Sequence, residues 1–169
     1  MHEAGRFALG LGKEQSVDSS RVNAIIDYVV NRQNDDGGYT FCQGAESNAQ
    51  DTYYGLAILE LLGSSFPHIE KTVKWLQELS LDSIYSHYYV GKALLVCGEN
   101  LDNRFRKRVT SAISSDGYFG NVDVYVEVSS EFTTTFMILE FASILEMEFD
   151  GSTVRNWLLQ YRKDRKSVV

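Results

Sequence analysis

The chain has 169 residues, of which 44% are hydrophobic and 23% charged, and its formal net charge is −7. This length suits one domain with a proper core, and the acidic balance argues against a general nucleic-acid binder, whose surface is basic. No apolar run approaches the length of a membrane span, and no secretory signal opens the chain. The two cysteines, Cys42 and Cys97, lack metal-ligand spacing, so we expect a cytoplasmic protein with reduced thiols.

The first 17 residues show no sustained hydrophobic period. We predict a lead-in segment over residues 1–17, able to dock through Phe7, Leu9 and Leu11, and a single repeat domain over residues 18–169. Cap-type residues from Asp18 onward precede apolar residues at i, i+3, i+4 and i+7. This pattern predicts a one-sided, outer helix that ends near residue 33.

A glycine turn and an apolar helix come next. Asp36-Gly37-Gly38 ends the outer helix, because glycine reaches positive φ at little steric cost. Ser47 with Gln50 fits a capping box for a helix from about Ala49 to Leu62. Nearly every residue of this helix from position 53 onward is apolar or aromatic, so other helices must cover it on more than one side.

Weaker copies of this plan recur downstream. Pro67 suits the first turn of a second outer helix, and a second inner helix follows without the glycine loop. The later predicted elements are, in order, an inner helix at 84–97, an outer helix with Phe105, Val109, Ala112 and Ile113, a turn at 116–120, an inner helix at 129–145, a break at Asp150-Gly151 and a fourth outer-type helix with Val154, Trp157, Leu158 and Tyr161.

The spacing of these copies indicates stacked helical hairpins. Gly63 superposes on Gly98 with an offset of 35, and Ile58-Leu59-Glu60 superposes on Ile138-Leu139-Glu140 with an offset of 80. By these offsets Asp51, Ser86 and Glu131 are equivalent positions. The alternative is an irregular helical bundle. In the repeat interpretation Leu56, Leu94 and Leu139 belong to one inward layer.

The turn Gln33-x-x-Asp36-Gly37-Gly38-Tyr39, followed by Asp51-Thr52-Tyr53, resembles the repeat of the α/α-toroid superfamily. That superfamily contains the protein prenyltransferase β subunits and the squalene and terpenoid cyclases. The resemblance implies an all-α fold, a partial α/α toroid built as an arc of about three helical hairpins plus a terminal helix. It also implies a cavity whose mouth lies at the N-terminal ends of the inner helices, where helix dipoles attract anions.

Neither catalytic motif of the superfamily is complete. Prenyltransferases hold zinc with an aspartate, a cysteine two positions on and a distant histidine; Asp51 matches the aspartate, but Tyr53 takes the cysteine position. Cyclases use a D-x-D-D acid, whereas Asp35-Asp36 is the only adjacent acidic pair and fits a turn role. We predict no metal ligands and expect no cofactor, while zinc and magnesium stay open.

The predicted site follows from the equivalent helix starts. Asp51, Glu131 and His87 are the candidate catalytic residues. The candidate substrate-binding residues are Tyr53, Tyr54, Tyr88, Tyr89 and Glu46. Their simpler interpretation is structural: acidic residues complement a helix N-terminus, and tyrosines suit a core or a cavity wall equally.

Three functions remain open from the sequence. In the first, the chain is an isoprenoid enzyme or part of one. In the second, it is a catalytically silent module that holds a peptide, glycan or lipid tail in an aromatic-lined cavity, and in the third, it is an interaction module that completes a ring with another chain or within a longer gene product. The expected partners are an isoprenoid or peptide ligand and a second copy or partner subunit over the open edge of the arc, with no nucleic acid and no membrane span.

Overall fold

The computed structural model describes residues 18–112 and 131–164. Over these ranges the chain forms seven helices and no strand. They are α1 (Ser19–Val30), α2 (Ala49–Leu61), α3 (Ile69–Glu78), α4 (Ile84–Val96), α5 (Asn103–Ser111), α6 (Glu131–Ile144) and α7 (Gly151–Asp164). The predicted lead-in segment, the turn at 116–120, Ile113 and the start of the third inner helix at Ser129 lie outside the described residues. None of the described helices is long and apolar enough to cross a lipid bilayer.

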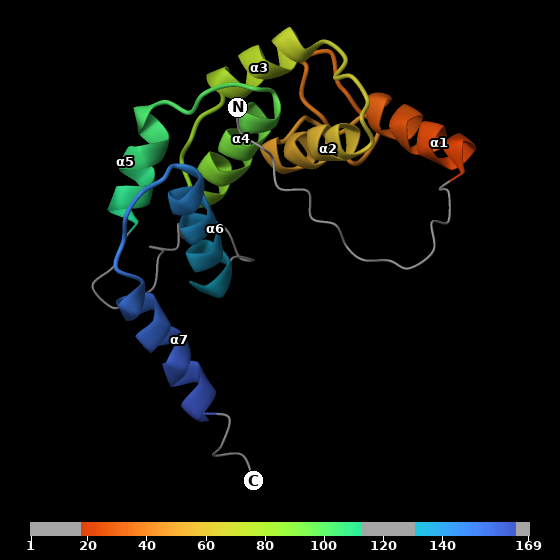
Figure 1. The fold of residues 1–169 in the computed structure, drawn as a ribbon. Coiled ribbons are helices and arrows are strands. Elements are labelled where there is room, and N and C mark those ends of the chain that lie inside the picture. The colour runs from red at the N-terminus through yellow and green to blue at the C-terminus, as the bar shows by residue number, and fades with distance from the viewer. Residues whose placement is uncertain (1–17, 113–130, 165–169) are drawn as a thin grey trace.

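The helices form two layers along an arc (Figure 1). In the inner layer α2 packs against α4, and α4 packs against α6. In the outer layer α1 packs on α2, α3 packs on α4, and α5 packs on both α4 and α6. This arrangement is the predicted all-α, partial α/α toroid.

A single hydrophobic cluster runs through the inner layer. Leu56 and Leu94 are buried in it, and Leu139 is partly buried against it, which confirms the predicted shared layer. Helices α2 and α4 end at glycines with positive φ, Gly63 at 65° and Gly98 at 83°. In each case the residue after the glycine donates its N–H to a carbonyl in the last full turn, which closes the helix end.

The local details of two helix starts differ from the prediction. The N-cap of α2 is Asn48, whose side chain accepts a hydrogen bond from the N–H of Asp51, so the capping box predicted at Ser47 is wrong. The Ser47 hydroxyl instead donates to Asp36, because the turn brings that carboxylate within 2.8 Å. Pro67 precedes α3, whose N-cap is His68 in the left-handed region, and Gly151 is the first residue of α7.

The offset between the first and third inner helices is also corrected. Thr52, Gly55, Leu56 and Leu59 are the buried residues of α2, and the residues 82 positions later, Thr134, Met137, Ile138 and Phe141, are buried in α6. With the predicted offset of 80, Leu56 would correspond to Phe136, which is 61% exposed. Two residues turn a helix by about 200°, so the predicted superposition placed the wrong face inward. The first residue of α6, Glu131, therefore corresponds to Ala49, and Asp51 corresponds to Thr133.

Candidate functional site

The glycine turn fixes the first hairpin to the second. The side-chain amide of Gln33 donates to the Pro67 carbonyl at 2.9 Å and to Thr72 Oγ1 at 3.0 Å. A Cβ on Gly37 would stand 2.6 Å from the backbone carbon of Lys71, so only glycine allows α3 to approach this closely. Asp36 accepts hydrogen bonds from the N–H of Gly38 and from Ser47, which confirms its interpretation as a turn residue.

The start of α2 is built around the Asp51 carboxylate. Its Oδ2 accepts from the Phe41 N–H at 2.9 Å and from Asn48 Nδ2 at 2.7 Å. The neighbouring Thr52 hydroxyl accepts from the Tyr39 N–H at 2.8 Å. These bonds hold the loop across the first turn of the helix. Asp51 therefore acts here as a loop anchor at the N-terminus of α2, where its charge also suits the helix dipole.

The four tyrosines predicted to bind substrate come together. Ring centroids lie 5.1 Å apart for Tyr53 and Tyr54, 5.8 Å for Tyr54 and Tyr89, and 5.1 Å for Tyr88 and Tyr89. Tyr85, which sequence reasoning missed, lies 4.6 Å from Tyr89. We call these five residues the tyrosine cluster. It joins α2 to α4, and its tilted and edge-to-face ring contacts stabilise the packing of the two helices.

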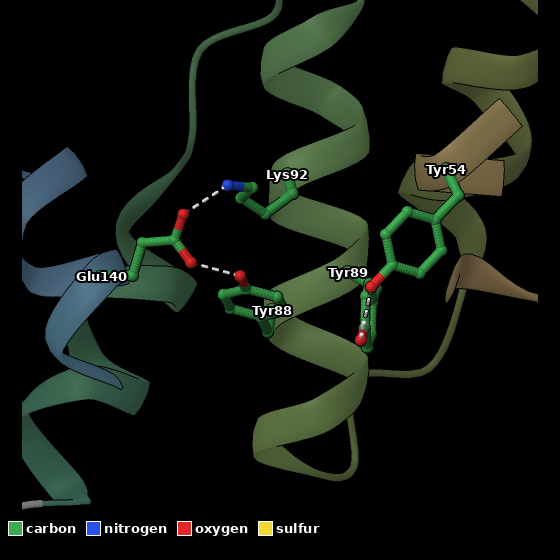
Figure 2. A network of polar contacts seen from close by, with 5 residues as sticks. All are labelled: Tyr54, Tyr88, Tyr89, Lys92 and Glu140. Carbon is green, nitrogen blue, oxygen red and sulfur yellow. Dashed lines mark hydrogen bonds and ion pairs between the residues drawn. The ribbon is translucent and has the colours of Figure 1, made fainter. Parts of the chain in front are cut away.

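A charged pair borders the tyrosine cluster on the side of α6 (Figure 2). Lys92 of α4 donates to Glu140 of α6 at 2.6 Å, and the Tyr88 hydroxyl donates to the other carboxylate oxygen of Glu140. The ammonium of Lys92 also lies 5.3 Å from the ring centre of Tyr53 and 5.7 Å from that of Tyr88. The cation is thus shared between one carboxylate and two ring faces.

The surroundings keep this pair ionised and the phenols neutral. Burial opposes both charges, but their hydrogen bond raises the pKa of Lys92 and, with the bond from Tyr88, lowers the pKa of Glu140. Burial and the hydrogen bond to Glu140 both raise the pKa of Tyr88. Burial and the neighbouring Tyr54 hydroxyl raise the pKa of Tyr89. The site therefore presents neutral aromatic faces beside a compensated charge.

A pocket of about 140 Å³ continues the aromatic surface toward α1. Its lining includes Tyr28 and Arg32 of the first hairpin, Phe41 of the loop, and Asp51 and Tyr54 of α2. Tyr54 is 48% exposed and belongs to both the pocket and the tyrosine cluster. Tyr54 therefore connects the pocket to the tyrosine cluster, whose buried members Tyr88 and Tyr89 lie between it and the Lys92–Glu140 pair.

The candidate catalytic residues occupy separate places. His87 faces the outer layer: its ring lies 5.8 Å from the Phe105 ring of α5, and its Nδ1 lies 2.8 Å from the Ser83 carbonyl. Burial lowers the pKa of His87. Glu131 is the half-buried first residue of α6, and Glu46 is exposed in the loop before α2. None of the hydrogen bonds described above joins Asp51, His87 and Glu131.

A prenyltransferase-type zinc site does not fit these residues. Asp51 is held by the Phe41 N–H and Asn48, Tyr53 stands at the cysteine position, and His87 points to α5. Within the described ranges no group of three or more His, Cys, Asp or Glu side chains is placed to hold a metal ion. We therefore assign no chemical step to a metal.

Of the two residues of the ion pair, which the sequence analysis missed, Lys92 alone has a local sequence signal. Lys92 lies one helical turn after Tyr88, on the same face of α4, so its nearness to the cluster was accessible from helical spacing. Glu140 could not be paired with Lys92 while the offset of α6 was wrong. The pairing of these two residues depends on how α6 is positioned and rotated against α4.

Residues 7–84 of the chain match the family model described as the prenyltransferase alpha-alpha toroid domain. The matched range takes in α1, α2 and α3 together with the glycine turn. No curated protein and no solved structure matches the chain.

Proposed function

We propose that this chain, of which residues 7–84 match the prenyltransferase alpha-alpha toroid domain, binds an elongated apolar ligand along the tyrosine cluster, with an isoprenoid as the best example. The observation that carries the proposal is the aromatic surface of Tyr53 and Tyr54, which packs on the buried Tyr89 and continues into a pocket through Tyr54. Aromatic rings offer apolar area at low conformational cost, which suits a flexible hydrocarbon chain.

The charge arrangement favours recognition of the apolar tail over the headgroup. Lys92 borders the tyrosine cluster, and Glu140 already neutralises it at 2.6 Å. The other cation of the site, Arg32, lines the pocket together with the Asp51 carboxylate, and its guanidinium lies 4.6 Å from the ring centre of Tyr28. A diphosphate at Lys92 would have to displace the Glu140 carboxylate, and separating a partly buried ion pair is costly. The proposal therefore includes no prenyl transfer, and the catalytic roles of Asp51, Glu131 and His87 stay predictions.

Titration of the full chain with three compounds tests the proposal. We expect farnesol and farnesyl diphosphate to raise the melting temperature alike, because ligands of the native state stabilise it, and inorganic diphosphate to have no effect. Tyr54→Ala should weaken both farnesyl compounds about tenfold, a loss of about 1.4 kcal/mol, whereas the matched control Tyr54→Phe keeps the ring and should bind as before. Binding of inorganic diphosphate alone, or equal binding by Tyr54→Ala, would contradict the proposal.

A second candidate function is an interaction module that completes a ring. It is favoured by apolar side chains exposed on the last two described helices: Phe136 of α6 is 61% exposed, and Leu158 and Leu159 of α7 are 44% and 40% exposed. Exposed apolar side chains are where an interaction surface would form, and these three residues are the candidates for one. Sedimentation should then show self-association that Phe136→Asp abolishes, and a monomer at all concentrations would argue against pairing with a second copy.

A further inference from the structure

The pocket between α1 and α2 is closed at its inner end by buried residues and has an aromatic rim. Val29, Tyr39 and Gly55 belong to its lining, and all three are buried. The rim residues Tyr28 and Phe41 are 56% and 70% exposed. A ligand group that enters the pocket covers these two rings, and removing apolar area from water favours binding.

The pocket has room for one small apolar group. Its volume is about 140 Å³, and a cavity of about 150 Å³ with apolar walls takes up benzene. One isoprene unit has fewer carbons than benzene and fits the same space. The rest of a longer chain therefore lies outside the pocket, against the ring of Tyr54, which is 48% exposed.

The charges in the pocket favour an apolar group over an anionic one. The lining holds the guanidinium of Arg32 and the carboxylate of Asp51, so the formal charges of this pair cancel. A diphosphate that entered the pocket would meet the Asp51 carboxylate as well as Arg32, and like charges repel. The pocket therefore suits the apolar end of an amphiphilic ligand.

The polar groups of the site gather on the side of Tyr54 that faces α4 (Figure 2). The Tyr54 hydroxyl lies 3.5 Å from the Tyr89 hydroxyl. Gln50, one helical turn before Tyr54, accepts a hydrogen bond from the Tyr85 hydroxyl, and its Nε2 lies 3.4 Å from the Tyr89 hydroxyl. Gln50 and Tyr85 are half-buried, so this polar edge is accessible to a ligand.

We propose that the pocket binds the apolar end of the ligand and that the edge formed by Gln50 and Tyr85 faces its polar end. The ligand class that follows is a single-chain amphiphile that ends in one isoprene unit or one ring. This inference rests on the proposed function and adds to it the direction in which the ligand lies. It also assigns selection to the end group of the chain, because a bulkier terminus exceeds the volume of the pocket.

Photolabelling of the full chain tests the direction. Two farnesol analogues carry a diazirine, one at the end of the hydrocarbon chain and one beside the hydroxyl. We expect the first to label Tyr28, Phe41 or Ile58 and the second to label Gln50 or Tyr85, each in competition with farnesol. The reversed pattern, or one shared pattern, would overturn this inference and leave ligand binding intact. No label that farnesol competes away would contradict the proposed function, and this inference with it.

A pair of variants tests the selection of the end group. Ile58 lines the pocket and is 36% exposed, so Ile58→Trp narrows the pocket from its rim. In calorimetric titration this variant should bind farnesol at least about tenfold more weakly, because the terminal unit then stays in water. The matched control is Leu61→Trp, on the same face of α2 but outside the lining, which should bind farnesol as the wild type does. Equal affinities of the two variants would overturn the assignment.

Arg32→Met separates the two ends of the ligand. It removes the charge from the pocket, and we expect it to change the affinities for farnesol and farnesyl diphosphate by the same factor. A loss confined to farnesyl diphosphate would place the headgroup in the pocket and overturn the proposed direction.

Discussion

At the residue scale, Lys92 and Glu140 each rely on the other to balance a partly buried charge. Glu140→Gln would leave the Lys92 ammonium, 17% exposed, without its carboxylate. We expect unfolding free energy to fall by about 1–3 kcal/mol, the usual cost of an unsatisfied buried group. Chemical denaturation measures this, with the exposed Glu148→Gln as a control that should stay within about 0.5 kcal/mol. Replacing both partners by leucine should recover part of the loss, and no recovery would contradict this account.

The lowered pKa of Glu140 also makes the stability of the protein depend on pH. The stability that the carboxylate contributes is present above the unfolded-state pKa of glutamate, about 4.3, and is lost as pH falls through the lower folded-state pKa. On acidification the wild type should therefore lose more stability than Glu140→Gln. Denaturation midpoints of both proteins between neutral and acidic pH give the comparison, and parallel curves would refute it.

His87 should make the stability of the protein depend on pH in a different, higher pH range. Its Nδ1 donates to the Ser83 carbonyl and its pKa is lowered by burial, so the folded protein holds the neutral ring. The unfolded chain takes up the proton near pH 6.5, so stability is complete above that pH and decreases below it, down to the folded-state pKa. We expect His87→Gln to flatten the stability profile between pH 7.5 and 5. An unchanged slope would show that His87 does not titrate differently on folding.

At the level of elements, Gly91 sets how closely α4, α5 and α6 approach. A Cβ there would stand 2.2 Å from Cζ of Phe141 and 3.0 Å from Cε1 of Phe105. Gly91→Ala should therefore destabilise by about 1–3 kcal/mol through overpacking, although alanine favours helices. Adding Phe141→Leu should relieve part of the loss in calorimetry. A Gly91→Ala protein more stable than wild type would contradict the packing.

The helices themselves were largely predictable, and their mutual rotation was not. Apolar spacing and glycine turns located α2 and α4 to within a residue or two, because both signals are local. The cap assignment failed at Ser47 because Asn48 can also cap α2 and because the Ser47 hydroxyl donates a hydrogen bond to Asp36 in the turn. The offset of α6 failed because three matching residues, Ile-Leu-Glu, do not reveal which side of a helix is buried. The tyrosines were found from helix starts, whereas the Lys92–Glu140 pair needed the correct offset.

On the scale of the whole molecule, α4 is the centre of the described structure. It packs against α2, α3, α5 and α6, whereas α7 meets the rest through few residues such as Val154 and Trp157. Opening free energies follow burial, so amides of α4 should exchange most slowly and those of α7 fastest among the described helices. Hydrogen exchange followed by mass spectrometry measures the order, and equal protection of α4 and α7 would contradict it.

The hydrogen bonds from Gln33 to Pro67 and Thr72 have a consequence for how the architecture can change. They set the spacing of neighbouring hairpins from the outer layer, while Phe41 and Ala45 are tied to the turn and to α2 by hydrogen bonds with Asp51 and Asn34. Between these anchors, Gly44 has open space around it. The rim can thus be lengthened at residues 43–44 without altering curvature, which makes this point the natural place for grafting a new specificity onto an unchanged scaffold.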